Sequence, residues 1–262
     1  MELDPIQQAA QEQFARQSSQ YGRGHILEDV ADVRAALSQI PLPAHATVLD
    51  VATGGGHTGL LLASLGHDAI LADLAQPMLD RAARLAAERG LAVTTRQHAA
   101  ETLPYPDEHF DLVTCRVAAH HFSSPESFVR ESARVLRPGG FFLLIDGSVP
   151  DDQPEAEAWI HALEKWRDPS HHHFLTPRAW RELCGRSSLQ VRSAELQPLK
   201  QPNLDWYFAA AATPTENRQE VLKLIETASA PVRAAFRLAK EEGKITWWWP
   251  RLTLIAQKPR PA

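Results

Sequence analysis

The chain has 262 residues, and its 27 Lys and Arg against 32 Asp and Glu give a formal net charge of −5. A hydrophobic fraction of 44% and a charged fraction of 23% indicate a globular protein, either one ordinary domain with additions or two small domains. The mild negative charge and the lack of a basic stripe argue against nucleic acid as the main partner, because phosphate binding requires clustered cations.

The sequence contains no run of about 18 apolar residues, so we expect no membrane span. The first residues lack a cationic start followed by an apolar run, and we therefore expect no signal peptide. Two cysteines, Cys115 and Cys184, are too few for a disulfide framework, which favours a reducing cytoplasm.

Two helices are expected at the start of the chain, over residues 5–18 and 26–40. From residue 46 to residue 147, short apolar or β-branched runs then alternate with segments of helical periodicity. The runs predict strands at 46–52, 68–73, 92–97, 110–117 and 141–145. This alternation predicts right-handed βαβ units, and therefore a parallel sheet with helices on both faces.

The pattern after residue 147 is looser. A helix is expected over 154–167, followed by the tract RDPSHHHFLT and by a helix that starts near Pro177. We then expect a strand, a mainly helical stretch and a final strand, at 189–196, 203–242 and 245–257. Pro250 in the final strand suggests an edge position or a bulge, because proline cannot donate a ladder hydrogen bond.

A glycine-rich turn, VLDVATGGGHTG, follows the first expected strand and opens a helix. Gly54, Gly56 and Gly59 have the spacing G-x-G-x-x-G, and Asp73 ends the next strand, 23 residues after Asp50. Glycines let a ligand approach the backbone, and a carboxylate accepts hydrogen bonds from both ribose hydroxyls. The arrangement is compatible with NAD, FAD or S-adenosylmethionine; a turn needed only for tight strand–helix packing is the alternative.

Asp50 distinguishes among these cofactors. It stands at the end of the first expected strand, directly before the glycine turn. An anion at this position would repel a pyrophosphate, whereas it would attract a cationic sulfonium that also carries an α-amino group. The charge pattern therefore favours S-adenosylmethionine over the dinucleotides.

Four motifs have an order and spacing that resemble class I S-adenosylmethionine-dependent methyltransferases. They are VLDVATGGG, LADLAQPML, AAETLPYPDEHFDLVTCRVAAHHF and ESARVLRPGGFFLL, all within residues 46–147. The chain is most similar to the ubiquinone/menaquinone C-methyltransferase-like group, also called methyltransferase type 11. The resemblance implies methyl transfer from S-adenosylmethionine to a small-molecule acceptor, at carbon or oxygen, without indicating which acceptor.

The resemblance also implies which residues bind the cofactor. The methionine part is expected at the first motif, where the family often has glycine in place of Ala52. Asp73 matches the acid that binds the ribose hydroxyls, with Leu74 and Met78 close to adenine and ribose. The expected cofactor contacts are Asp50, Ala52, Gly54, Gly56, Asp73, Leu74, Met78, Ala100, Glu101, Arg116 and Val117.

The expected fold class is α/β: a Rossmann-like, seven-stranded, mostly parallel sheet with helices on both faces. A helical lid at 1–45 would precede the cofactor-binding core at 46–150, and residues 151–262 would supply a helical insertion and the last two strands. Tyr21 and His25 are expected in the lid near the substrate, because related enzymes close such a segment over the reacting centre and exclude water. A helix that only packs on the sheet is the alternative.

Three histidines are candidates for a general base, because imidazole titrates near neutral pH. His120 and His121 follow the fourth expected strand, at the edge where open α/β sheets bind ligands, and His171 lies in the later histidine tract. Packing roles or a solvated loop are the alternatives. We expect no metal site, because adjacent loop histidines rarely converge on one centre and no further ligand stands at suitable spacing.

Two other classes of protein stay open at this level. An NAD-linked oxidoreductase would use the same glycine turn, but it would not explain LPYPDEHFD or RPGG. A non-catalytic S-adenosylmethionine-binding module would keep the turn and have a filled substrate cavity. The sequence does not predict the oligomeric state.

Overall fold

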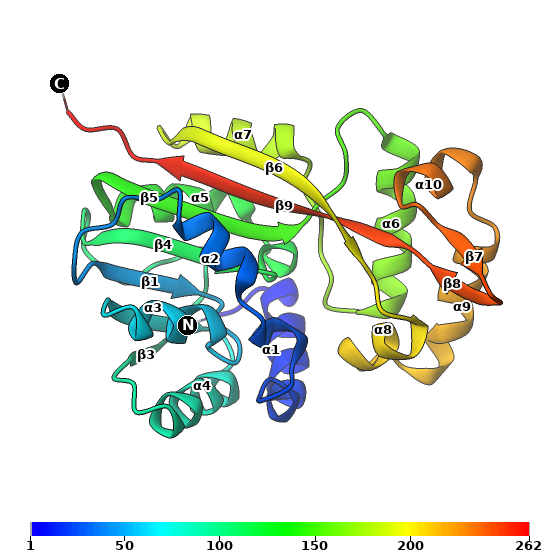
Figure 1. Ribbon diagram of the computed structural model, residues 1–262, viewed down its shortest axis with the longest axis horizontal. Coiled ribbons are helices and arrows are strands. Elements are labelled where there is room, and N and C mark those ends of the chain that lie inside the picture. The colour runs from blue at the N-terminus through cyan, green and yellow to red at the C-terminus, as the bar shows by residue number, and fades with distance from the viewer. Residues whose placement is uncertain (1, 262) are drawn as a thin grey trace.

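The centre of the molecule is one seven-stranded sheet with the strand order β3-β2-β1-β4-β5-β9-β6 (Figure 1). The computed structural model describes residues 2–261. Strands β1 to β5 run parallel, and β9 runs antiparallel to both β5 and β6. The strands are β1 (Thr47–Val51), β2 (Asp68–Asp73), β3 (Thr94–Gln97), β4 (Phe110–Arg116), β5 (Leu136–Gly147), β6 (Gln190–Lys200) and β9 (Trp248–Gln257). The predicted α/β fold with a mostly parallel sheet of seven strands is confirmed.

Helices cover both faces of the sheet because successive strand residues point to opposite sides. Val48 belongs to one hydrophobic cluster and its neighbour Leu49 to the other, and both side chains are fully buried. One cluster includes α2 (Ala31–Leu37), α3 (His57–Ser64) and α4 (Gln76–Glu88); the other includes α5 (Pro125–Val135) and α7 (Pro177–Arg186). A strand covered on both faces is mostly apolar, as β1 is apart from Thr47 and Asp50.

Strand β9 as a whole is interior, but at Pro250 it pairs with β6 alone, so the predicted edge position applies to this residue and not to the strand. On this side the edge strand is β6, which places Pro198 opposite Pro250. The pairing of β9 with β5 ends where Arg251 lies opposite Gly147, one residue away from Pro250. No amide donor toward β5 is therefore needed at Pro250, and its carbonyl still accepts a hydrogen bond from the Ser148 amide at 3.0 Å.

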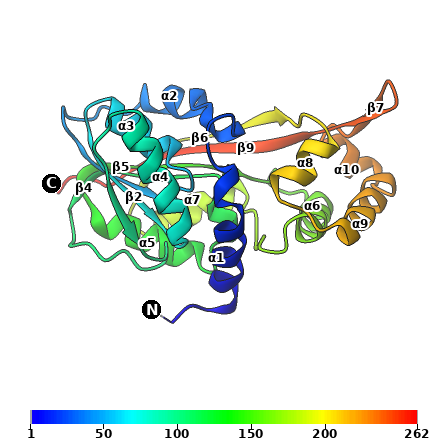
Figure 2. The same cartoon turned by 90° about the horizontal axis from the view of Figure 1, so that it is seen from below.

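A helical lobe lies beyond the carboxyl end of β5, and the long strands β6 and β9 extend from the sheet into it (Figures 1 and 2). Its core is aromatic, with Tyr207, Phe236 and Trp247 buried together. The helix predicted at 154–167 is confirmed as α6. The lobe consists of α6 (Pro154–Arg167), α8 (Leu204–Ala210), α9 (Thr215–Glu226), α10 (Ala230–Ala235), β7 (Ala239–Glu241) and β8 (Lys244–Thr246).

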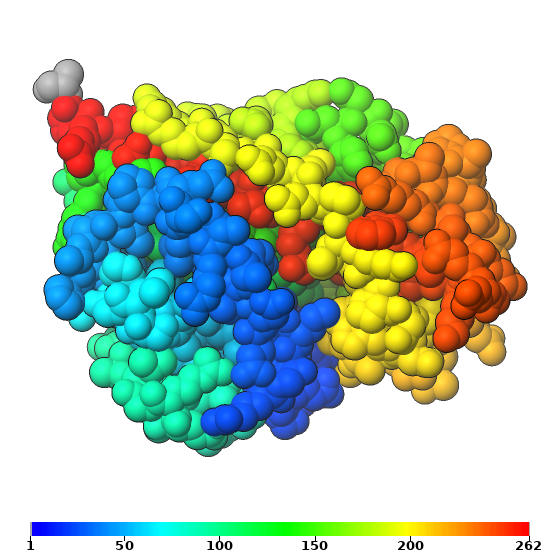
Figure 3. Space-filling view, viewed as in Figure 1, coloured from blue at the N-terminus to red at the C-terminus, as the bar shows by residue number. Residues whose placement is uncertain are grey.

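The N-terminal segment lies between the helices of the sheet and the helical lobe (Figure 2). Its first helix, α1 (Pro5–Gln17), begins at a capping box in which the Asp4 side chain accepts two helix amides and the Gln7 side chain accepts the Asp4 amide. Two short 3-10 turns, η1 (Ser18–Gln20) and η2 (Ile26–Glu28), follow. In Figure 3 this blue segment covers the front of the molecule beside the yellow part of the lobe.

Within residues 2–261, no helix combines the length and the apolar character that crossing a membrane requires.

Candidate functional site

A cleft with an empty volume of about 860 Å³ lies at the carboxyl ends of β1, β2 and β4, beneath α1. In open α/β sheets, ligands bind at this edge where the strand order reverses, and here β1 stands between β2 and β4. The residues predicted from the sequence that line the cleft are Tyr21, Ala52, Gly54, Asp73, Leu74, Ala100, Glu101, Arg116, Val117 and His121. The predicted residues outside its lining are His25, Asp50, Gly56, Met78, His120 and His171.

Gly56 lets the glycine turn pack closely against α4. Gly56 has a φ of +87°, and a Cβ atom there would lie 2.8 Å from the Ala82 Cβ on α4. Only glycine allows both this conformation and this close approach. Met78 is fully buried on the same helix. Gly56 therefore sets how closely the turn packs against α4.

Asp50 anchors the glycine turn from inside the protein. Its buried carboxylate accepts hydrogen bonds from Thr53 Oγ1 at 2.5 Å, from Thr114 Oγ1 at 2.7 Å and from the Gly59 amide at 3.0 Å. Burial raises the pKa of this carboxyl, against the effect of these hydrogen bonds. Because the carboxylate faces the turn and the start of α3, it holds the cleft in shape without lining it.

Asp73 faces the cleft from the end of β2. Its Oδ2 accepts the Gly54 amide at 2.9 Å, and its Oδ1 accepts the Ala75 amide at 2.9 Å. Burial raises the pKa of this carboxyl to about 6. The two amides orient a carboxylate beside the glycine turn, and such a group can accept hydrogen bonds from a vicinal diol.

Glu101 links the N-terminal helix to the loop after β4. One of its oxygens accepts the Gln7 side-chain amide at 2.9 Å, and the other accepts the Ser123 amide and hydroxyl at 2.9 and 3.1 Å. A second contact of α1, from Gln11 Nε2 to the Leu74 carbonyl at 3.0 Å, lies beside it. These polar contacts hold α1 across the mouth of the cleft.

Arg116 attaches the segment around η2 to the end of β4. Its guanidinium donates to the Leu27 carbonyl at 2.8 Å, to the Asp29 carbonyl at 2.6 Å and to the Asp32 carboxylate at 3.0 Å. The side chain is 6% exposed, so water screens these contacts little. Arg116 lines the cleft, but its guanidinium nitrogens are directed at the N-terminal segment.

Two residues that line the cleft have backbone conformations that are unusual for their residue types. Ala52 has a φ of +52° at the end of β1, and Val117 has a φ of +53° after β4. A left-handed conformation is costly for alanine and more so for a β-branched residue. Strain of this kind concentrates at functional sites, where surrounding contacts enforce it.

The N-terminal segment contacts the glycine turn directly. The Tyr21 ring stacks on the His25 ring with 4.3 Å between the centroids, and His25 Nδ1 accepts the Leu27 amide at 3.2 Å. His25 therefore caps η2 instead of facing the cleft, and burial lowers its pKa to about 4. At Gly55, a Cβ atom would lie 2.4 Å from the Tyr21 carbonyl oxygen.

We expect Gly55→Ala to lower the free energy of unfolding by about 1–3 kcal/mol, because the added methyl group must displace the Tyr21 backbone. Urea denaturation measures this loss, and faster amide exchange over residues 18–28 will localise it. Gly185→Ala is the matched control, since the same methyl group on α7 meets open space and helix propensity favours alanine. Unchanged exchange over 18–28 in Gly55→Ala would contradict this packing.

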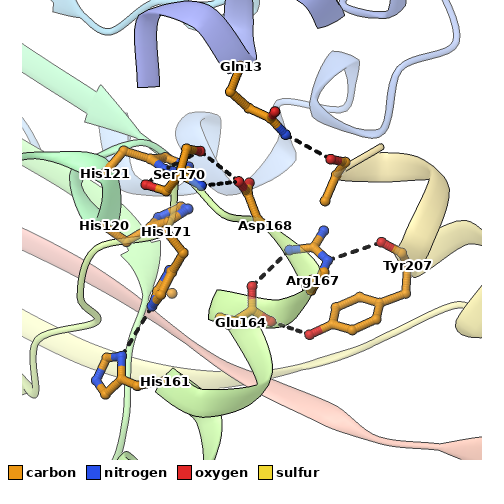
Figure 4. A network of polar contacts seen from close by, with 12 residues as sticks. Gln13, His120, His121, His161, Glu164, Arg167, Asp168, Ser170, His171 and Tyr207 are labelled. Atoms are coloured by element: carbon orange, nitrogen blue, oxygen red, sulfur yellow. Dashed lines mark hydrogen bonds and ion pairs between the residues drawn. The ribbon is translucent and has the colours of Figure 1, made fainter. Parts of the chain in front are cut away.

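His121 is the predicted histidine that lines the cleft, and its ring packs edge-on against Phe14 of α1 at 4.8 Å. Its Nδ1 lies 3.0 Å from the Ser170 carbonyl, which can only accept, so Nδ1 carries a proton. Ser170 is itself held by Asp168, which accepts its hydroxyl at 2.6 Å (Figure 4). Burial lowers the pKa of His121 to about 4. The ring is therefore neutral at pH 7, with an unprotonated Nε2.

His120 turns away from the cleft into a buried polar network. Its Nδ1 donates to Asp146 Oδ1 at 2.7 Å, and its amide donates to Asp146 Oδ2 at 2.9 Å. Burial disfavours the charged ring, but the Asp146 carboxylate outweighs this effect and raises the pKa of His120. Asp146 is the second-last residue of β5, as Asp73 is the last of β2, and an acid at the carboxyl end of a strand was the sequence signal that could have identified it.

His171 lies in the same network, with its Nε2 3.1 Å from His161 Nδ1 on α6 (Figure 4). Burial lowers the pKa of His171. Nearby, the Tyr207 hydroxyl donates to Glu164, which also pairs with Arg167 at 2.9 Å and so joins α8 to α6. The network members missed by the sequence analysis are Asp146, His161, Glu164, Arg167, Asp168, Ser170 and Tyr207.

The fold and the cleft define a Rossmann-like α/β protein with a ligand-sized cleft at the carboxyl edge of its sheet. A family model described as a methyltransferase domain matches residues 49–144. The uncharacterized methyltransferase YcgJ of Bacillus subtilis is 32% identical over 225 residues, which cover 85% of this chain and 88% of YcgJ. The chain therefore belongs to this methyltransferase family.

Two further comparisons agree. A solved structure of a putative methyltransferase from Bacillus halodurans superposes with a TM-score of 0.82 at 30% identity, covering 87% of this chain and 99% of the other. A demethylmenaquinone methyltransferase of Thermus thermophilus is 39% identical over 105 residues, which are 39% of this chain and 48% of that protein. The matched methyltransferase domain and the similarity to YcgJ identify the protein as an enzyme of the methyltransferase class.

Proposed function

We propose that the protein transfers a methyl group from S-adenosylmethionine to a small-molecule acceptor in the cleft under α1. The observation that carries this proposal is the Asp73 carboxylate, which two backbone amides orient beside the glycine turn at the edge of the cleft. Membership of the methyltransferase family supports the reaction class and removes the NAD-linked alternative.

The residues of the cleft fit an adenosine cofactor. Asp73 would accept the ribose hydroxyls, as carboxylates do in related folds. Gly54, with a φ of +55°, leaves the space between the turn and the Tyr21 ring open, and a Cβ atom there would come within 3.5 Å of that ring. Leu74 and Ala100 provide apolar surface for a base, and Glu101 provides a carboxylate at its edge.

Asp50 contributes to this site through the turn and not through its charge. Its oxygens accept hydrogen bonds from Thr53, Thr114 and Gly59 inside the protein. A direct attraction between this carboxylate and the sulfonium of the cofactor is therefore a weaker argument than the sequence suggested. What Asp50 does is to hold the Gly54 amide next to Asp73. We propose that the binding of the methionine part depends on the resulting position of the turn.

S-adenosylmethionine, when bound, supplies an electrophilic methyl group on a sulfur that is already a good leaving group. The protein then needs to align the acceptor with the methyl–sulfur bond, an orientation effect worth up to ~7–11 kcal/mol in model reactions. The covering helix α1 would exclude water, with Phe14 and Tyr21 over the cleft. His121 would accept a proton at Nε2 from an acceptor that must lose one, since its Nδ1 is held protonated by Ser170.

We further propose that three consecutive segments of the chain have separate roles. Residues 1–45 would act as the lid, 46–150 would bind the methyl donor, and 151–262 would close the acceptor side through the helical lobe. Tyr21 would belong to the lid surface that faces the ligand, and His25 would support it by capping η2.

Isothermal titration calorimetry with S-adenosylhomocysteine, S-adenosylmethionine and NAD⁺ tests the proposal. We expect one equivalent of each sulfur compound to bind and NAD⁺ not to bind. Folded wild-type protein that binds neither sulfur compound would overturn the proposal. Incubation with S-adenosylmethionine and candidate quinols, phenols and hydroxylated metabolites, followed by mass spectrometry, then looks for a methylated product. Binding without transfer to any acceptor would favour a non-catalytic module.

A further inference from the structure

We propose that the helical lobe carries a divalent transition-metal site, of the kind that binds Zn²⁺, formed by Glu157, His161 and His173. Glu157 and His161 lie one turn apart on α6, and His173 reaches them from the segment that follows this helix. Each residue offers one ligand atom, and the three atoms lie within 4.8 Å of one another. This site is separate from the cleft and does not depend on the proposed methyl transfer.

The spacing of the ligands on α6 has a simple helical origin. Residues four apart on an α-helix share one face, so a Glu and a His at i and i+4 can contact the same ion. The third ligand, His173, does not belong to this helical spacing. It lies in the 168–176 segment, which follows α6 and folds back along it. His173 Nε2 already lies 3.5 Å from Glu157 Oε1, across a half-exposed surface.

The distances require only a small adjustment. Zinc binds histidine nitrogen and carboxylate oxygen at about 2.0–2.2 Å, so in a tetrahedral site neighbouring ligand atoms are about 3.4 Å apart. The Glu157–His173 pair has nearly this separation. The His161 and His173 rings lie face to face with 4.0 Å between their centroids, so one ring must turn for both nitrogens to reach one ion. All three residues are half-buried, and their ligand atoms, now within 4.8 Å of one another, need to close by at most about 1.4 Å.

A second, independent observation points to His161 as a ligand. Its Nδ1 is bonded to His171 Nε2 at 3.1 Å, while its Nε2 is buried without a hydrogen-bond partner among residues 2–261. An unpaired buried nitrogen is costly unless something binds it. Metal-ligating histidines usually have their second nitrogen engaged in this way, which fixes the orientation of the ring. His171 therefore occupies the position of a supporting residue behind the ligand.

The donor set indicates the class of metal. Two imidazoles and one carboxylate suit Zn²⁺ and its neighbours in the first transition row better than Mg²⁺ or Ca²⁺, which prefer oxygen ligands. The three side chains leave a fourth position on the solvent side, where Glu157 and His173 are 35% and 40% exposed. A bound ion would join α6 to the 168–176 segment, which also carries Ser170 behind His121.

Zinc binding to the full-length, untagged protein tests the proposal, after removal of metal with a chelator. Competition against a chromophoric chelator should give one zinc ion per chain, and Co²⁺ substitution should give the visible absorption of a low-coordinate site. Zinc at about 100 times its dissociation constant should raise Tm by roughly 5–10 °C. We expect His173→Ala and Glu157→Gln each to weaken zinc binding at least tenfold.

The control is His172→Ala, which removes an exposed histidine from the same tract and should leave zinc affinity unchanged within about twofold. His173→Ala and Glu157→Gln change a pair on the surface, so the metal-free variants should melt within a few degrees of wild type. Absence of zinc binding to the wild type would overturn the site. Wild-type affinity in either ligand variant, or a tenfold loss in His172→Ala, would overturn this choice of ligands.

Discussion

Replacing Asp73 by alanine is expected to weaken the binding of S-adenosylhomocysteine by an order of magnitude or more. The carboxylate faces the cleft from the end of β2, with one oxygen on the Gly54 amide and the other on the Ala75 amide. Removing it would take away the proposed acceptor for the ribose hydroxyls, and a tenfold loss corresponds to about 1.4 kcal/mol. Titration calorimetry at pH 7.5 measures the change directly.

The pH dependence of binding gives a second measure of the same group. Burial raises the pKa of Asp73 to about 6, so wild-type affinity should fall as the pH drops below 6 and the carboxylate gains a proton. Asp73→Ala should lose this dependence.

The stability of Asp73→Ala should change little at neutral pH. A raised folded-state pKa means that the ionised carboxylate costs stability above pH 6, and this cost disappears as the pH falls toward 4. Asp68→Ala, at the exposed amino end of the same strand, is the control for affinity. Equal affinities of Asp73→Ala and Asp68→Ala would contradict the assignment of Asp73 to the ribose.

Replacing Asp50 by alanine is expected to lower the free energy of unfolding by about 1–3 kcal/mol. The buried carboxylate accepts hydrogen bonds from Thr53, Thr114 and Gly59, and its loss leaves at least the Gly59 amide without a partner. An unpaired buried donor costs about 1–3 kcal/mol. Removing a buried charge returns part of this cost, since burial already raises the pKa of Asp50. Urea denaturation at pH 7 measures the difference.

Asp50→Asn is the matched variant, because its amide oxygen keeps an acceptor at nearly the same place. We expect it to lose less stability than Asp50→Ala and to bind S-adenosylhomocysteine better. A loss below about 1 kcal/mol for Asp50→Ala, with unchanged ligand affinity, would show that the glycine turn holds its shape without this anchor.

Local sequence patterns were enough to predict the sheet and one edge of the site. Three features follow one another in the sequence: the apolar run of β1, the glycines after it and the acid at the end of β2. Each of them can be recognised from a short stretch of neighbouring residues. Asp73 illustrates this, since a carboxylate at the end of a strand beside a glycine turn must lie at the carboxyl edge of a parallel sheet. One of its contacts is local, with the Ala75 amide two residues later, and the other joins it to the Gly54 amide, 19 residues earlier in the preceding βα unit.

Residues whose partners are distant in the chain were predicted less well. Arg116 was expected beside the cofactor, yet its guanidinium binds Leu27, Asp29 and Asp32, more than 80 residues earlier. Pro250 suggested an edge position or a bulge, but it did not indicate that β6 pairs on the far side of β9 and makes the strand as a whole interior. Neither arrangement leaves a periodic signal in the sequence, because it depends on which elements meet after folding.

The sequence by itself determined the class of fold, the methyltransferase motifs and the position of Asp73 at the binding edge. These depend on residue spacing within single βα units, where hydrophobic period and glycine geometry act locally. The tertiary structure alone decided that His121 lines the cleft while His120 does not, and that His173 meets Glu157 and His161. The adjacent side chains of His120 and His121 point in different directions, and His173 meets residues more than ten positions earlier. Both results depend on how the helical lobe packs against the sheet, and not on local periodicity.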